Sequence, residues 1–167
     1  ELGDVAGLAA AAGAGVQNHF SRLGVVSREY VRDMYGETDS FLHRGIGTDR
    51  LVATWDMDSE RVRHRLSGRA PPPAWEEVGS VPRVVPVTAG GAFPAPGSPL
   101  LDGEGAALLL PIPSDLGPMM ETDLPVAVRW REATREPFLH YLSRGYQVRE
   151  YVRGEVVSHY LLTRDDA

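Results

Sequence analysis

The chain has 167 residues, of which 43% are hydrophobic, and a net charge of −6; all 17 basic residues are arginine, and cysteine is absent. This length suits one domain with a hydrophobic core. The acidic net charge excludes nucleic-acid binding. The lack of an apolar run of roughly 18 residues excludes a membrane span. Without lysine or cysteine there is no Schiff-base or P-loop lysine, thiol nucleophile, zinc thiolate or disulfide, and a reducing cytoplasm is the expected compartment.

The first part of the chain predicts one helix and two strands. The Ala-rich segment Asp4 to Leu23 is expected to be a helix, with Asp4 as its N-cap and Gly24 after its end. Alternating, β-branched residues predict strands from Val25 to Arg32 and from Asp49 to Met57. Glycines between these strands indicate a loop.

A proline-rich segment separates this part from the rest. Residues 67–103 contain most of the prolines, which favours a linker or a surface excursion with a short strand near 83–87. We expect this segment to be peripheral and to carry no catalytic residue. The apolar run from Ala106 to Ile112 then predicts a buried strand.

The last part predicts a long helix followed by a strand pair. The helix should begin at Asp123 with Pro125 in its first turn, should be kinked or divided by Pro137, and should end before Gly145. Strands are expected from Tyr146 to Arg153 and from Val156 to Arg164, with the turn at Gly154.

These elements predict an α/β (α+β) fold in which a mixed sheet is covered by helices. We divide the chain into 1–66, 67–103 and 104–167, which together form one compact domain. The sequence leaves a homodimer open as an arrangement in solution.

An internal repeat connects the two ends of the chain. Residues at the end of each helix and on the next strand recur 121 positions later: His19, Gly24 and Arg28 to Arg32 match His140, Gly145 and Arg149 to Arg153. Each copy places a helix end and a glycine before the sequence REYVR. Structural duplication and chance recurrence of arginine-rich strands are the two interpretations.

The local motifs give little chemistry. The five histidines lack the close spacing of metal ligands, and the DMDSE segment at Asp56 to Glu60 lacks the glycine of an EF-hand loop. GIGTDR, from Gly45 to Arg50, precedes a predicted strand rather than a helix. It therefore favours a tight turn over a phosphate-binding loop. No metal site is predicted.

Two parts of the sequence resemble a known superfamily. The ending PFLHYLSRGYQVREYVRGEVVSHYLL resembles the last helix and final strand pair of the GNAT acyl-CoA N-acyltransferases. More narrowly, NHFSRLGVVSREYVRDMYG, LHRGIGTDRLVATWDMDSERV, LLLPIPSDL and WREATREPFLHYLSRGY resemble a predicted, poorly characterised bacterial GNAT group.

The resemblance implies a splayed sheet, acyl-CoA as co-substrate and a small amine or amino acid as acceptor. The tyrosine that usually protonates the leaving thiolate stands four residues before a glycine, which corresponds to Tyr141 before Gly145 and to Phe20 before Gly24. Tyr141 is therefore the candidate catalytic residue. The Q/R-x-x-G-x-G/A cofactor turn does not occur in this sequence, so the chain resembles a C-terminal portion of such a protein and weak or absent acyl-CoA binding is expected.

Three functional hypotheses remain. The first is an N-acyltransferase, and the second is a non-catalytic binding or dimerisation module derived from that fold. In the third, the arginine-rich strands hold an anionic ligand without turnover.

Overall fold

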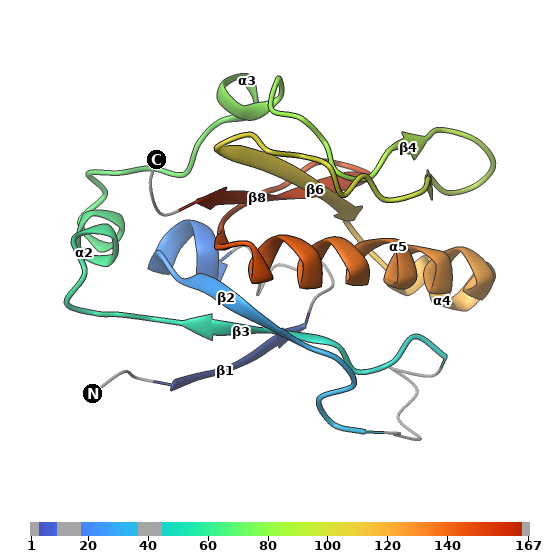
Figure 1. The fold of residues 1–167 in the computed structure, drawn as a ribbon, viewed down its shortest axis with the longest axis horizontal. Helices are drawn as coiled ribbons and strands as arrows, with labels where there is room; N and C mark the ends of the chain where they lie inside the picture. The colour runs from blue at the N-terminus through green and yellow to red at the C-terminus, as the bar shows by residue number, and fades with distance from the viewer. Residues whose placement is uncertain (1–3, 10–17, 37–44, 165–167) are drawn as a thin grey trace.

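A six-stranded sheet forms the centre of the molecule, with strand order β1–β3–β2–β7–β8–β6 (Figure 1). The computed structural model describes residues 4–9, 18–36 and 45–164. The predicted α+β class is confirmed. Every pair of neighbouring strands in the sheet is antiparallel, and the parallel component of the expected mixed sheet is confined to one bridge between Arg83 and Leu109. The strands are β1 (Asp4–Ala9), β2 (Val26–Val31), β3 (Arg50–Thr54), β6 (Ala107–Pro113), β7 (Tyr146–Val152) and β8 (Val157–Arg164).

The five predicted strands are confirmed and share this sheet, but the predicted first helix is wrong at its start. Residues Asp4–Ala9 form β1, which pairs with β3 from Asp4 opposite Thr54 to Ala9 opposite Arg50. Pairing with the open side of β3 outweighs the weak helix preference of a short, glycine-containing segment. Residues 10–17 of the predicted helix lie outside the described residues. The helical end that is described is the short π-helical turn η1 (Asn18–Arg22).

The long helix α5 (Leu124–Ser143) lies across one face of the sheet (Figure 1). It begins where predicted, because the Asp123 carboxylate accepts a hydrogen bond from the Val126 N–H at 3.3 Å. Of the expected kink or division at Pro137, the division is wrong, since α5 continues through this residue, and the kink stays a prediction. Pro137 is buried on the packed face of the helix, where tertiary contacts outweigh one lost backbone bond. The smaller elements are α2 (Glu60–Leu66), α3 (Trp75–Val78), β4 (Val87–Thr88), β5 (Ala95–Pro96) and α4 (Gly117–Thr122).

The sequence repeat is a structural duplication. Each half runs outer strand, helix, inner strand and middle strand: β1, η1, β2 and β3 in the first, and β6, α5, β7 and β8 in the second. The two inner strands meet at the centre of the sheet through one registered pair, Ser27 opposite Val148. These two residues occupy the same position of the repeat. The halves are therefore related by an approximate two-fold axis that passes between β2 and β7.

An aromatic cluster joins the two halves beneath the helices. Phe20 of η1 contacts Tyr160 of β8 with ring centroids 5.8 Å apart, and Tyr30 of β2 stacks on Phe138 of α5 at 5.0 Å. Phe138 also meets Tyr160 edge to face at 5.6 Å. Each half thus completes the core of the other, and neither buries its aromatic face alone.

The proline-rich segment is more than a surface excursion. Val84 and Val85 are buried in the main core, and the Val84 N–H donates to the Leu109 carbonyl at 2.9 Å. Val78 of α3 packs on the other side of the sheet with Leu109 and Leu161. Prolines exclude a long strand here, yet the short stretches between them cover β6 and both faces of its half of the sheet.

The two glycines that follow η1 and α5 allow a matched comparison of packing at equivalent positions of the repeat. Gly24 and Gly145 both have left-handed backbones, with φ of 72° and 85°, so alanine at either position should cost about 1 kcal/mol in backbone strain. A Cβ at Gly24 would lie 3.1 Å from Cγ of Arg65, whereas open space surrounds Gly145. Urea unfolding should therefore show a larger loss for Gly24→Ala than for Gly145→Ala. Equal losses in the free energy of unfolding would contradict the tighter packing around Gly24.

Candidate functional site

The hydroxyl of Tyr141, the candidate catalytic residue, faces the backbone of the proline-rich segment. It donates to the Leu100 carbonyl at 2.7 Å and accepts from the Gly103 N–H at 3.1 Å. The side chain is fully buried, and burial raises the pKa of the phenol. In this arrangement Tyr141 attaches segment 100–103 to α5. Its catalytic role stays a prediction.

A hollow of about 500 Å³ lies near Tyr141 but is lined by its neighbours. Leu101, His140, Arg135 and Arg32 contribute to it. The hollow is open to solvent and carries charges of both signs, because Glu132 and Glu136 also line it. It lacks the convergent set of like charges that would select one ligand.

The histidines provide no metal site in the part of the chain that the structure describes, where no three His, Asp or Glu side chains come together. His159 is buried against the Trp75 ring at 4.8 Å, and burial with nearby Arg83 lowers its pKa to about 4. His43 lies outside the described residues. Among the described helices, none is long and apolar enough to cross a bilayer.

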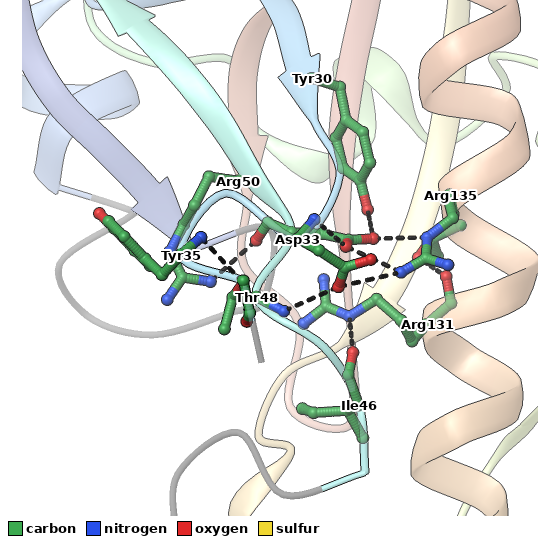
Figure 2. Close-up of polar contacts among 11 residues, drawn as sticks. Tyr30, Asp33, Tyr35, Ile46, Thr48, Arg50, Arg131 and Arg135 are labelled. Atoms are coloured by element: carbon green, nitrogen blue, oxygen red, sulfur yellow. Dashed lines mark hydrogen bonds and ion pairs between the residues drawn. The ribbon is translucent and has the colours of Figure 1, made fainter. Parts of the chain in front are cut away.

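A buried carboxylate, Asp49, forms the main polar centre beneath α5. Tyr30 of β2 donates to it at 2.6 Å, and Arg135 of α5 donates twice, at 2.7 and 2.8 Å. The Asp33 N–H adds a fourth hydrogen bond at 3.0 Å. Figure 2 shows Tyr30 and Asp33, from β2 and the residues after it, on one side and Arg135 of α5 on the other. Asp49 belongs to the GIGTDR segment, which forms the predicted turn before β3.

These contacts fix the charge of Asp49. Burial alone raises its pKa, but the hydrogen bonds from Arg135, Tyr30 and the Asp33 backbone outweigh burial and set the pKa at about 2. Burial and the bond to Asp49 raise the pKa of Tyr30. Both groups therefore keep one protonation state at neutral pH. The centre connects β2, the turn and α5, and it is a structural feature rather than an acid–base pair.

A second polar region lies at the junction of the repeats. A pocket of about 250 Å³ is lined by residues of β2, β7, the end of β3 and α2. Arg28 and Arg149, which occupy the same position of REYVR, both line it. Each arginine follows one residue of the registered pair Ser27–Val148, so both stand next to the seam between β2 and β7. The other lining residues are Gly24, Val26, Thr54, Asp56, Ser59, Arg61 and Val62.

Each of these arginines stands at a β-bulge. The pairing of β2 with β3 shifts between Ser27 and Glu29, and the pairing of β7 with β8 shifts between Val148 and Glu150. Arg28 and Arg149 are thus the extra residues of two equivalent bulges. Bulges interrupt the strand ladder and redirect a side chain, and they are common next to binding sites.

Arg61 of α2 is held rigidly at the wall of the pocket. It donates through Nε to the Gly24 carbonyl at 3.0 Å and through its terminal nitrogen to the Arg149 carbonyl. The same nitrogen lies 2.9 Å from the buried Glu150, which also pairs with Arg65. Burial raises the pKa of Glu150 against the opposing effect of these arginines. These contacts hold the Arg61 guanidinium in a fixed position at the pocket.

The repeat was the sequence signal for this pocket. It marked Arg28 and Arg149 as equivalent, and the hypothesis of an anion held by arginine-rich strands named the same strands. The roles of Asp56 and Arg61 were not predicted, because their approach to β7 depends on how α2 packs, which local patterns do not encode. The importance of Asp49 was also missed, since its partners Tyr30 and Arg135 are distant in sequence.

The chain matches no model of a known protein family, no curated protein and no solved structure. Its function must therefore be argued from the site itself.

Replacing Asp49 by asparagine should destabilise the protein by about 3 kcal/mol, because Arg135 then loses its buried charge partner. The wild type should also lose about 2 kcal/mol as the pH falls from 4 to 2, since the pKa of Asp49 is lowered from 3.8 to about 2 in the folded state. The stabilisation that ionised Asp49 contributes is fully present above pH 5. Urea unfolding across this pH range measures both effects.

Asp33→Asn is the matched control. Asp33 is half exposed and lies 3.8 Å from Arg135, and asparagine tolerates its left-handed backbone, φ 45°. This variant should lose less than about 1 kcal/mol and keep the acid dependence of the wild type. The same acid dependence in Asp49→Asn would contradict the assignment.

Proposed function

We propose that this chain is a ligand-binding module related to the N-acyltransferases, and that it binds the carboxylate of a small molecule in the pocket between its repeats. The observation that supports this is the pair of equivalent bulges that direct Arg28 and Arg149 to one pocket. A guanidinium group matches a carboxylate in shape and charge and donates two parallel hydrogen bonds to it.

The charge of the pocket is opposite to that of the whole chain. The protein carries a net charge of −6, yet three arginines line this pocket and Asp56 is the one carboxylate among its lining residues. A pocket lined by more guanidinium groups than carboxylates favours an anionic ligand over a neutral one.

The relation to N-acyltransferases is supported by the resemblance of the chain's ending to the last helix and strand pair of that superfamily. α5, β7 and β8 form such a helix and antiparallel pair. N-acyl transfer from acyl-CoA to a small amine or amino acid is therefore the second candidate function, with Tyr141 as its acid. The backbone contacts of the Tyr141 hydroxyl favour binding as the function of this chain.

Removing either bulge arginine should weaken ligand binding. With 4-methylpentanoate as the probe, Arg28→Gln and Arg149→Gln should each raise the dissociation constant about tenfold, the worth of a hydrogen bond to a charged group. Isothermal calorimetry in a low-salt, phosphate-free buffer measures this, with inorganic phosphate as a second probe for anions in general. Circular dichroism shows whether the variants remain folded.

Arg153→Gln is the charge-matched control, because Arg153 is exposed beyond the end of β7 and does not line the pocket. Its affinity for the probe should equal that of the wild type. No binding by the wild type, or equal weakening by Arg153→Gln, would refute the proposed site.

The second candidate has its own test. If Tyr141 protonates the leaving thiolate, Tyr141→Phe should lower turnover of acetyl-CoA in the intact enzyme by on the order of 10²- to 10⁴-fold. Tyr146→Phe is the control, because the Tyr146 hydroxyl also donates to a backbone carbonyl, that of Gly105, at 2.6 Å. Both variants should lose about 1 kcal/mol of stability. Equal turnover of the two variants would leave Tyr141 a structural residue.

A further inference from the structure

We infer that helix α2 is the movable wall of this pocket, which opens transiently from the sheet and is held closed by a bound anion. This inference rests on the proposed function and names the regulation of the same site. The structure shows the closed arrangement, in which β2 and β7 form one side of the pocket. The side that belongs to α2 and the turn before it comprises Asp56, Ser59, Arg61 and Val62. A ligand that fills the pocket therefore contacts both sides.

Apolar packing contributes little to the position of α2. The helix is seven residues long, and Val62 is the one buried residue within it. Exposed residues flank the packed part at both ends, in 56–58 and 66–69, and Gly68 has a left-handed backbone with φ of 71°. Figure 1 shows α2 at the side of the sheet, apart from the long helix α5. A short helix with so little buried apolar surface is typical of the segments that open first in a folded protein.

Charged contacts hold α2 instead, and they are incompletely satisfied. Arg61 and Arg65 both pair with the buried Glu150 of β7, and Arg65 also donates to the Ser21 carbonyl at 3.2 Å. Burial nevertheless raises the pKa of Glu150 and lowers the pKa of Arg65, because their attraction does not offset the loss of hydration. Among the described residues, Oε2 of Glu150 and Nε of Arg65 are buried without a hydrogen-bond partner. Buried charges in this state stabilise a contact only weakly.

A bound anion would strengthen the contact between α2 and the sheet. Arg149 acts electrostatically on Glu150 together with Arg61 and Arg65, and Arg61 and Arg149 also line the pocket. An anion in the pocket adds negative charge beside these arginines while α2 is closed. When α2 opens, Arg61 leaves the pocket and the anion loses one cationic partner. The anion therefore binds the closed state more tightly, and this difference in affinity shifts α2 toward closure.

Gly24 sets how closely α2 approaches the sheet. A Cβ at this position would lie 3.1 Å from Cγ of Arg65 and 3.3 Å from Cα of Val62. The Gly24 carbonyl also accepts the Arg61 Nε–H at 3.0 Å. A side chain here would push α2 outward, whereas Gly145, at the equivalent position of the repeat, faces open space. Alanine at these two positions thus gives a matched pair of variants that differ in their effect on α2.

Amide hydrogen exchange measures the opening of α2 directly. In the free protein, the amides of α2 should exchange faster than those of β7 and β8. With 4-methylpentanoate at ten times its calorimetric dissociation constant, exchange in α2 should slow about tenfold. The amides of α4, a short helix that does not line the pocket, should keep their rates. The uncharged 4-methylpentanamide at the same concentration should leave exchange in α2 unchanged.

Gly24→Ala should speed exchange in α2 on the order of tenfold, because overpacking moves the helix outward. Gly145→Ala is the matched control, since Gly145 also has a left-handed backbone but no side chain of α2 beside it. It should leave exchange in α2 at the wild-type rate. Equal rates for α2 in the two folded variants would overturn the inference. Should Gly24→Ala fail to fold, exchange in the wild type still decides the question.

The outcomes separate the two proposals. Calorimetric binding of 4-methylpentanoate without slower exchange in α2 would overturn the movable wall and leave the carboxylate site in place. Exchange in α2 that is no faster than in β8 would also overturn the movable wall. Equal slowing by 4-methylpentanamide would refute the role of the anion. Absence of calorimetric binding would overturn the proposed site and this inference with it.

Discussion

The seam between β2 and β7 is the constraint on which the rest of the molecule depends. Each half supplies three strands, and the halves meet through a single registered pair, Ser27 and Val148. So short a backbone contact does not join two halves by itself. The aromatic rings that cross the seam beneath the helices provide the missing contact area, with Phe20 against Tyr160 and Tyr30 against Phe138.

The same short seam makes a pocket at this place possible. Beyond the registered pair, β2 and β7 no longer pair through their backbones, and side chains occupy the space between them. The two bulges direct Arg28 and Arg149 toward this space. Apolar side chains there would have extended the core. Guanidinium groups are instead charged donors that match a carboxylate in shape, so the junction favours ligand binding over further packing. The Asp49 centre, near the other end of β2, serves a structural purpose instead, since the Asp49 carboxylate is paired with the Arg135 guanidinium and accepts a hydrogen bond from Tyr30.

Alternating, β-branched residues located β2 and β3, a short apolar run located β6, and the turn at Gly154 separated β7 from β8. The Asp123 cap located the start of α5. The sequence failed where distant contacts decide the local structure. An Ala-rich segment became β1 because β3 offered an open side, and Pro137 stayed within α5 because its face is buried. The repeat identified Arg28 and Arg149, since identity at equivalent positions is visible without a structure. It could not show that both lie on bulges, nor that α2 brings Arg61 and Asp56 to the same pocket.

The bulge arginines also bear on how such a site arises. A residue beside a two-fold axis is present twice, so duplication of a unit that already carried this arginine would deliver both guanidinium groups in one event. After fusion into one chain, each copy is free to change alone. Glu29 is exposed, whereas its counterpart Glu150 is buried and pairs with two arginines of α2. Symmetry supplied the common part of the pocket, and divergence made its two sides unequal, which is what an asymmetric ligand requires.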